Sequence, residues 1–373
     1  MQVSDWRNPM FSQTVDQLLP LLQLLQQPAF CLRQDNTVVC NDEARHLAPC
    51  SGKELTNWLG DSAPLYEQWN RQDPLTLPVT LSRQSASVIV QPLADGILFL
   101  MNDCRSLSAG VDAMSVTAQV LRQPLTELHS LTQQLSEDLE EMEDPILQRQ
   151  SAAITRHIYR LSRIACNLAD LEQISNGSYQ LRQEKLSLTD YLQELTQEME
   201  DICRTAGCTL ICKLPAKATN FAADPTLLER AILNLLSNAI KYGSRSKPIT
   251  FSVETTPSAI FFRMRNVCSQ EDSDLLSAAF QRISKRGILP DPQWGIGLGL
   301  PMTRYIAHLM GGAVAVEINQ EHEATVTMSI GRKNTAEVQT HALPPIDYTG
   351  GMRHSLLELS DVLPDDCFDS VSL

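Results

Sequence analysis

Residues 227–242 read LLERAILNLLSNAIKY and residues 295–300 read GIGLGL, and these two stretches decide the fold of the C-terminal half. The first predicts an apolar helix with one polar strip, which contains Asn234, Asn238 and Lys241. Asn234 and Asn238 lie one helical turn apart, so their side chains share a face. Amide oxygens suit magnesium or its waters, and a lysine supplies a counter-charge for phosphate. The helix therefore predicts a site for magnesium and phosphate groups.

The second stretch is a glycine-rich turn directly before a predicted helix at 301–310. Gly295, Gly297 and Gly299 allow backbone N–H groups to approach a phosphate group, which the positive end of the helix also favours. A glycine-rich turn at a helix start also occurs where elements pack tightly. The polar strip of the preceding helix favours phosphate binding, rather than tight packing, as the reason for this glycine-rich turn.

Helices and strands alternate through residues 186–332, which predicts an α/β sandwich with antiparallel strands. Ser187 and Asp190 form a capping-box pattern that predicts the start of the first helix. The predicted helices cover 187–203, 225–241 and 301–310, and the predicted strands cover 209–213, 249–253, 260–266, 313–318 and 324–330.

Three motifs in this order resemble the N, F and G2 boxes of sensor histidine kinases: NLLSNAIKY at 234–242, AFQR at 279–282 and GIGLGLPMTRYIAHLMGG at 295–312. The resemblance covers about 111–332. It implies the Bergerat ATP-binding sandwich of the GHKL superfamily, with ATP and Mg²⁺ as cofactors. By this likeness Asn238 would hold Mg²⁺ through ATP, and the residues between Phe280 and Gly295 would form a lid. The other implied nucleotide-binding residues are Asn234, Lys241, Tyr242, Gly295, Gly297, Leu298, Gly299 and Leu300.

The adenine-binding position departs from the family pattern. Counting back from Phe280, the family's aspartate falls on Asn266, and the glycines that follow it are replaced. A neutral amide still accepts a hydrogen bond from the adenine amino group, but a charge-assisted bond is about twice as strong. The resemblance therefore predicts ATP binding with reduced affinity.

The phosphoacceptor box departs further. The family motif, His-Glu-x-x-Thr or Asn-Pro-Leu, falls on QVLRQPL, and Pro124 fixes the register so that Gln119 takes the histidine position. The lone pair of an amide nitrogen is delocalised, so Gln119 cannot attack the γ-phosphate as an imidazole does. Val120 replaces the adjacent acid. Ordinary autophosphorylation at this site is therefore not expected.

Three functions remain open on these residues. The first is a regulatory or degenerate histidine kinase of two-component signalling, with a response regulator or a partner kinase as its partner. The second is an active enzyme. It is either a kinase that uses another acceptor, such as His129 or His157, both expected to be solvated, or that phosphorylates a partner subunit in trans, or it is a regulator phosphatase in which Gln123 orients the hydrolytic water. The third is a GHKL ATPase without phosphotransfer.

Leucines and isoleucines recur at helical spacing on both sides of Asp144-Pro145, which predicts a two-helix hairpin within residues 107–180. One hairpin cannot bury both apolar stripes, so a four-helix bundle in a homodimer is expected. Packing on neighbouring domains is the alternative. The stripes contain Leu121, Leu125, Leu128, Leu135, Leu139, Ile154, Ile158, Leu161, Leu168 and Leu171.

Residues 1–106 combine a short helical start with strand-like segments, which predicts a small α+β domain. Asn41, Ala44 and Leu47, at the end of a strand and the start of a helix, make this region resemble a PAS sensor domain. The predicted strands cover 29–32, 37–40, 75–81, 87–90 and 96–101.

Composition limits the partners and the location. The net charge of -14 disfavours a nucleic-acid partner. No apolar run reaches the roughly 20 residues of a membrane span, and no signal peptide is recognised, so a cytoplasmic location is expected. Cys203, Cys208 and Cys212 lack a nearby histidine and are interpreted as buried apolar residues rather than a zinc site.

The C-terminal residues 333–373 are acidic and are expected to form a flexible tail. Within them, HSLLELSDVLP at 354–364 places Leu356, Leu359 and Leu363 on one helix face. This segment suits docking into a partner's groove, and it suits equally folding back on its own chain.

Overall fold

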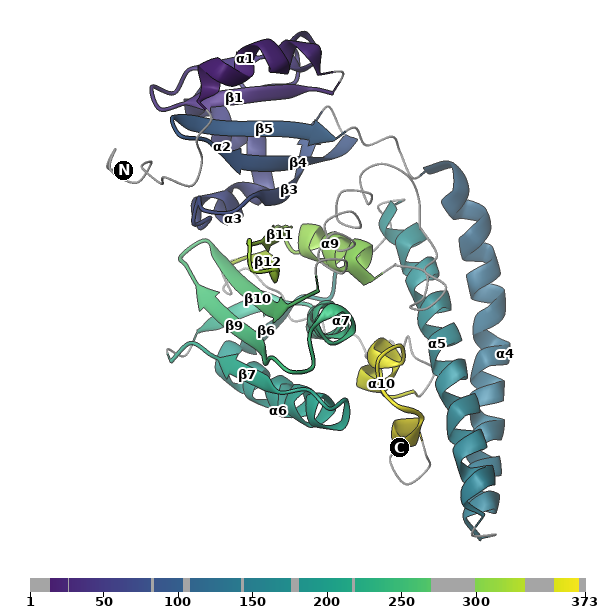
Figure 1. The fold of residues 1–373 in the computed structure, drawn as a ribbon. Helices are drawn as coiled ribbons and strands as arrows, with labels where there is room; N and C mark the ends of the chain where they lie inside the picture. The colour runs from purple at the N-terminus through teal and green to yellow at the C-terminus, as the bar shows by residue number, and fades with distance from the viewer. Residues whose placement is uncertain are drawn as a thin grey trace.

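The computed structural model describes residues 14–25, 27–81, 84–102, 108–141, 144–175, 181–216, 219–269, 299–332 and 352–368. These residues form an N-terminal α+β domain, a long helical hairpin and a C-terminal α/β domain, with the hairpin along one side of the C-terminal domain (Figure 1).

The N-terminal domain contains an antiparallel sheet in the order β2-β1-β5-β4-β3. Side chains alternate along each strand, so one face packs on α1 and the other on α2 and α3. Phe30 stacks on Phe99 with ring centroids 4.5 Å apart, and Trp58 meets Phe30 edge-on at 5.2 Å. All five predicted strands are present: β1 (Ala29–Arg33), β2 (Val38–Cys40), β3 (Leu75–Leu81), β4 (Gln84–Pro92) and β5 (Gly96–Asn102). The helices are α1 (Val15–Leu24), α2 (Leu55–Leu59) and α3 (Ala63–Glu67).

The C-terminal domain has a mixed sheet in the order β11-β12-β10-β9-β7, and three helices cover one of its faces (Figure 1). The parallel pair β7–β9 differs from the antiparallel arrangement expected from the sequence. The chain between these two strands includes a helix, which gives the crossover that parallel strands need. The strands are β7 (Leu210–Lys213), β9 (Ile249–Thr255), β10 (Ala259–Val267), β11 (Val314–Ile318) and β12 (Glu323–Gly331). The helices are α6 (Leu188–Thr205), α7 (Pro225–Tyr242) and α9 (Gly299–Leu309).

Two strand pairings were not predicted from the sequence. β6 (Glu184–Ser187) and β8 (Asn220–Ala223) form a separate small sheet. In addition, β3 pairs with β11, so the sheets of the two domains join into one ten-stranded sheet. Thr76 is opposite Val316 in this pairing, and Phe261 of the C-terminal domain packs into the N-terminal core.

The hairpin consists of α4 (Ser108–Glu141) and α5 (Pro145–Ser175). Their inner sides are held by apolar packing and by the hydroxyls of Ser136 and Ser151, 2.7 Å apart. A second apolar stripe stays between 45% and 60% exposed, at Leu121, Leu128, Leu131, Leu135, Ile154 and Leu161. The hairpin therefore buries only part of its apolar surface within the chain. Among the described helices, none has the length and apolar composition of a membrane span.

Residues 352–368 correct the expectation of a flexible tail for this part of the chain. They form α10 (His354–Leu359) and a 3-10 turn, η6 (Asp365–Phe368), packed between α5 and α7 (Figure 1). Leu356, Leu359 and Leu363 are buried in the core of the C-terminal domain. Of the two alternatives that the sequence left open, the segment folds back on its own chain.

Candidate functional site

α7 places the predicted polar strip against the remaining elements of the site. The helix begins where the Asp224 carboxylate accepts a hydrogen bond from the Leu227 N–H at 3.1 Å, and its apolar side is buried in the sheet. Asn234 is fully buried and Asn238 is half-buried, and neither amide nitrogen has a hydrogen-bond partner among the described residues. A buried polar group without a partner costs about 1–3 kcal/mol. Such groups are usually satisfied by water or a ligand.

The amino end of α9 lies against Asn234. A Cβ atom on Gly299 would lie 2.9 Å from Asn234 Oδ1, so only glycine allows this approach without a shift. The Thr303 hydroxyl donates a hydrogen bond to the Gly299 carbonyl at 3.0 Å, and Leu300 is buried. This is the end of the site at which the sequence placed the phosphates. Three further predicted loop residues, Gly295, Gly297 and Leu298, lie outside the described residues.

The carboxyl end of α7 lies against Asn266. A Cβ atom on Gly243, directly after the helix, would lie 3.4 Å from Asn266 Cβ, and the Ser244 N–H donates to the Val267 carbonyl at 2.7 Å. The Asn266 side chain is buried and donates through Nδ2 to Cys268 Sγ at 3.0 Å. The carbonyl oxygen is then the part of the amide left to accept a hydrogen bond.

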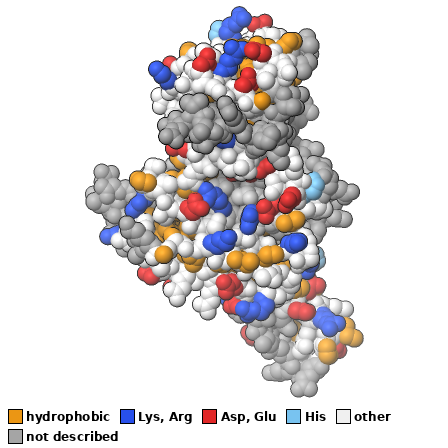
Figure 2. Space-filling model, turned by 60° about the vertical axis from the view of Figure 1, so that its left-hand side comes forward, with side chains coloured by type: hydrophobic (Ala, Val, Ile, Leu, Met, Phe, Trp, Pro, Cys, Tyr) orange, Lys and Arg blue, Asp and Glu red, His pale blue; other side chains and the backbone are white. Residues whose placement is uncertain are grey.

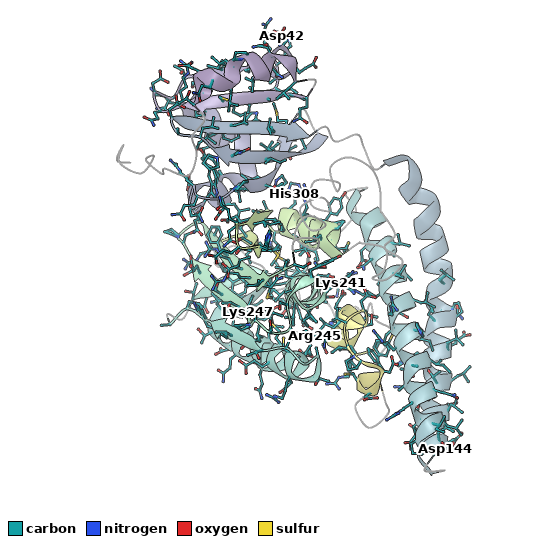
Figure 3. The ribbon with its side chains drawn as sticks, viewed as in Figure 1. Asp42, Asp144, Lys241, Arg245, Lys247 and His308 are labelled. Carbon is teal, nitrogen blue, oxygen red and sulfur yellow. The ribbon has the colours of Figure 1, made fainter. Side chains whose placement is uncertain are left out.

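Lys241 and Tyr242 lie at this same end of α7. Lys241 Nζ lies 5.2 Å from the centre of the Tyr242 ring. Lys241 is near the carboxyl end of the helix, and Arg245 follows in the next loop (Figure 3). The rise from Asn234 to Gly243 is roughly 13 Å. Asn234 therefore lies near the middle of α7, whereas Lys241, also predicted for phosphate, lies at the carboxyl end, where Gly243 meets the predicted adenine residue Asn266.

Two arginines that the sequence did not single out lie at the phosphate end. Arg163 of α5 donates from Nη2 to Asn234 Oδ1 at 2.6 Å. Arg230 of α7 is almost fully buried, donates to Asn167 Oδ1 at 2.6 Å and pairs with Asp170. The one available signal was an arginine, next to Glu229, inside the largely apolar stretch LLERAIL, since its partners are distant in sequence.

The predicted hairpin residues differ in their surroundings. Gln119 lies within α4, and its side chain lies outside the described residues. Gln123 is exposed and donates to Glu127 Oε1 at 3.0 Å.

The two histidines also differ. His157 is exposed, as expected, whereas His129 is only 4% exposed, which corrects the prediction that it is solvated. Its ring meets that of Tyr159 edge-on at 5.2 Å, and burial lowers the pKa of its imidazole. In this arrangement His129 is enclosed by the hairpin and is a poor phosphoacceptor.

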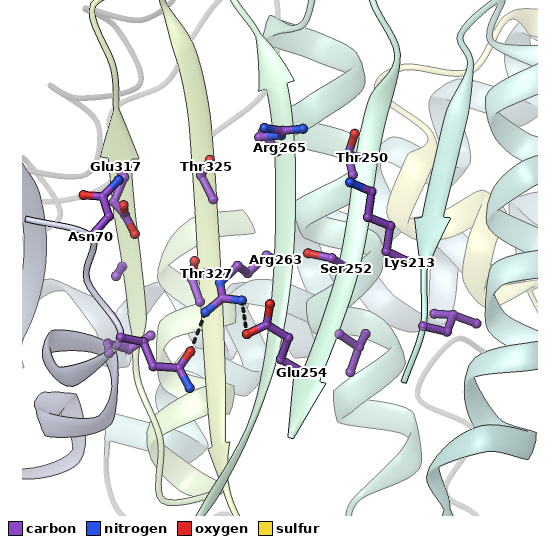
Figure 4. A pocket seen from close by; sticks show the side chains of 15 residues that line it. Asn70, Lys213, Thr250, Ser252, Glu254, Arg263, Arg265, Glu317, Thr325 and Thr327 are labelled. Atoms are coloured by element: carbon purple, nitrogen blue, oxygen red, sulfur yellow. Dashed lines mark hydrogen bonds and ion pairs between the residues drawn. The ribbon is translucent and has the colours of Figure 1, made fainter. Parts of the chain in front are cut away.

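A cavity of about 520 Å³ lies elsewhere, on the opposite face of the C-terminal sheet (Figure 4). Along β10, Arg263 and Arg265 point into it, whereas Asn266 belongs to the other face. Arg263 pairs with Glu254 at 2.7 Å. Arg263 and Glu254 therefore neutralise each other. On the face of the molecule shown in Figure 2, positive and negative side chains are intermixed. The cavity is separate from the residues predicted to bind the nucleotide.

The clustered cysteines are thiols in this environment. Burial raises the pKa of Cys203 to about 12 and that of Cys212 to about 11, so both side chains stay protonated near neutral pH. Within the described ranges, no three His, Cys, Asp or Glu side chains form a group suited to a metal ion.

Comparison with known proteins agrees with this geometry. Residues 223–334 match the family described as histidine kinase-, DNA gyrase B-, and HSP90-like ATPase. Sensor protein KdpD of Escherichia coli is 26% identical over 223 residues, 59% of this chain and 24% of that protein. Histidine-protein kinase AfsQ2 of Streptomyces coelicolor is 26% identical over 240 residues, 62% of this chain and 42% of that protein. The chain thus spans less than half the length of these two relatives.

Among solved structures, the chain also matches histidine kinase AdeS of Acinetobacter baumannii, with 18% identity, a TM-score of 0.39 and coverage of 56% of this chain and 97% of that chain. Full-length ShkA in complex with AMPPNP has 14% identity, a TM-score of 0.47 and coverage of 60% and 46%.

The sheet, its covering helices and the family match define residues 223–334 as an ATPase domain of the GHKL class. Within that class, it is a domain of the sensor histidine kinase type.

The geometry of α7 predicts a pH effect at Glu229. Burial raises the pKa of its carboxyl to about 7 from 4.5, and Glu198 and Glu358 add nearby negative charge. The folded state therefore holds the proton more tightly than the unfolded state, and this group lowers wild-type stability as the pH rises from 4.5 through 7. In Glu229→Gln this loss is absent, so the variant gains stability relative to wild type over that range, by about 3 kcal/mol.

Urea unfolding at several pH values measures this difference. The exposed Glu321→Gln variant, in the turn between β11 and β12, is the control. Parallel profiles for wild type and Glu229→Gln would show that the prediction is wrong.

Proposed function

We propose that this chain binds ATP with Mg²⁺ and acts in two-component signalling as a regulatory, degenerate histidine kinase that does not phosphorylate itself at position 119. One observation carries the nucleotide site: Asn234 on α7 meets the amino end of α9 at Gly299, and the amide nitrogens of Asn234 and Asn238 are buried without partners among the described residues. The degenerate activity rests on Gln119 and Val120, which supply neither a nucleophile nor a base.

The roles proposed for single residues depend on their positions along α7 and next to it. Asn238 holds Mg²⁺ through ATP, and Asn234, Gly295, Gly297, Leu298, Gly299 and Leu300 surround the phosphates. Lys241 and Tyr242 line the nucleotide, with Lys241 as a counter-charge for its phosphates, and Asn266 accepts a hydrogen bond from the adenine amino group. The buried Asn266, with its nitrogen bonded to Cys268, supports a role as a neutral acceptor.

The first test is nucleotide affinity, measured with a fluorescent ATP analogue in the presence of Mg²⁺. Asn238→Ala removes the proposed magnesium ligand, so we expect at least a tenfold loss of affinity, or about 1.4 kcal/mol. Asn57→Ala, on the exposed side of α2, is the control. Wild-type affinity in Asn238→Ala would remove Asn238 from the site. Wild-type protein that binds no analogue would overturn ATP binding itself.

The second test is incubation of the full chain with γ-labelled ATP. We expect no acid-labile label on the protein, because an amide is not a phosphoacceptor. Label on the chain would favour the active kinase. Released phosphate without label would favour the GHKL ATPase.

A phosphatase is a second candidate function, because the exposed Gln123 side chain on α4 is accessible to a phosphorylated regulator. An amide at this place could orient the water that hydrolyses an aspartyl phosphate. Equal dephosphorylation of such a regulator by wild type and by Gln123→Ala would end this alternative.

The proposed assembly is a homodimer in which the exposed stripe of the hairpin packs on a second copy. We expect wild type to sediment as a dimer and the double variant Leu128→Asp, Leu131→Asp as a monomer, because the charges would enter the apolar contact. Leu214→Asp, at a position 41% exposed on the C-terminal domain, is the control and should remain dimeric. A monomeric wild type at the same concentration would contradict the proposal. The N-terminal domain, whose helices α2 and α3 lie between β2 and β3, is proposed to be a PAS-like sensor module.

A further inference from the structure

Residues 352–368, called here the C-terminal clasp, lie between the hairpin and the ATPase domain (Figures 1 and 3). Leu357, Leu359 and Phe368 of the clasp are fully buried. The Phe368 ring lies 5.3 Å from the ring of Tyr159 on α5, and other clasp residues belong to the core around α7. The clasp is therefore held by both parts at once.

A buried carboxylate gives the clasp its polar grip. Glu358 is 0% exposed, with one oxygen 3.2 Å from Arg163 Nε on α5 and the other 2.9 Å from Arg230 Nε on α7. A buried charge is tolerated only when it is paired. Glu358 of the clasp thus forms ion pairs with both α5 and α7, which belong to separate parts of the chain.

The clasp engages a row of arginines along one face of α5. Arg156 Nη1 lies 2.9 Å from Asp365, and Arg160 Nε lies 2.9 Å from Asp361. Arg163 Nη1 lies 2.9 Å from the other oxygen of Asp361. Because these arginines are spaced three or four residues apart, they share a helix face. The acidic composition of the clasp matches this face.

The clasp also orients Arg163 toward the nucleotide site. Arg163 donates from Nε to Glu358 and from Nη1 to Asp361. Its remaining nitrogen, Nη2, donates to Asn234 Oδ1 at 2.6 Å. Nη2 also lies 3.8 Å from the position of a Cβ atom on Gly299. The guanidinium therefore occupies the Asn234 amide oxygen, one turn of α7 from the proposed magnesium ligand Asn238, and its positive charge repels the ion.

We propose that the C-terminal clasp is an autoinhibitory element that holds Arg163 on Asn234 and so opposes the binding of Mg²⁺–nucleotide. This inference rests on the proposed function, since it takes Asn234 as part of the nucleotide site. Coupling between two binding events is reciprocal. If the clasp opposes Mg²⁺–nucleotide, then Mg²⁺–nucleotide must loosen the clasp.

Hydrogen exchange of the full chain tests this reciprocity without any substitution. A non-hydrolysable ATP analogue is added with Mg²⁺ or with EDTA, and binding is measured in the same samples by equilibrium dialysis. We expect the amides of 354–363 to exchange several-fold faster with analogue and Mg²⁺ than in the free protein. Binding with unchanged or slower exchange overturns the inference alone. Absence of binding overturns the proposed function and the inference with it.

A variant tests the opposite direction of the coupling. Asp361→Asn combined with Asp365→Asn weakens the grip on α5 and leaves the buried pairs of Glu358 in place. We expect about tenfold tighter binding of the analogue with Mg²⁺, and little change with EDTA. Asp138→Asn, on the exposed side of α4, is the matched control. Unchanged or weaker Mg²⁺-dependent binding by the double variant, with circular dichroism like that of wild type, overturns the inference.

Discussion

Polar groups buried on α7 impose the constraint on which the arrangement of the C-terminal half depends. Arg230 and Asn234 lie on a helix packed into an apolar core, where the guanidinium of Arg230 and the amide oxygen of Asn234 need partners. Asp170 and Arg163 come from α5, and Glu358 comes from the C-terminal clasp. A buried ion pair adds little net stability, because the loss of hydration offsets the attraction. An unpaired member is strongly unfavourable, so these contacts select one arrangement of hairpin, domain and clasp.

Local patterns were enough to predict most helices and strands. The apolar periodicity and the Asp224-Pro225 start define α7, and alternating apolar residues define the five strands of the N-terminal sheet. The family resemblance also assigned Asn234 and Gly299 to the same nucleotide-binding site, and these two residues are in contact. Such features depend on neighbours in sequence or on a motif with fixed spacing. They can therefore be read without knowledge of the tertiary packing.

The features that the sequence did not predict depend on long-range partners. Arg163 and Glu358 are separated by 195 positions, and each alone resembles a charged residue on a solvated helix face. His129 has the helical spacing of a surface residue, yet the turn of the hairpin brings Tyr159 onto its ring. The acidic composition of residues 333–373 indicated mobility, but arginines on α5 pair with the acidic residues of the clasp and hold it in place. Charge complementarity between distant segments, rather than either composition, decides such cases.

The pairing of β3 with β11 has a mechanical consequence for the chain. Backbone hydrogen bonds run from the N-terminal sheet into the sheet of the ATPase domain, and apolar residues such as Phe261 cross the same boundary. The N-terminal domain is thus joined to the ATPase domain twice, through the covalent path along α4 and α5 and through this seam. A rotation of the N-terminal domain about the hairpin must either break the seam or carry the ATPase domain with it. The two connections form a closed loop, in which a displacement at one joint is transmitted to the other.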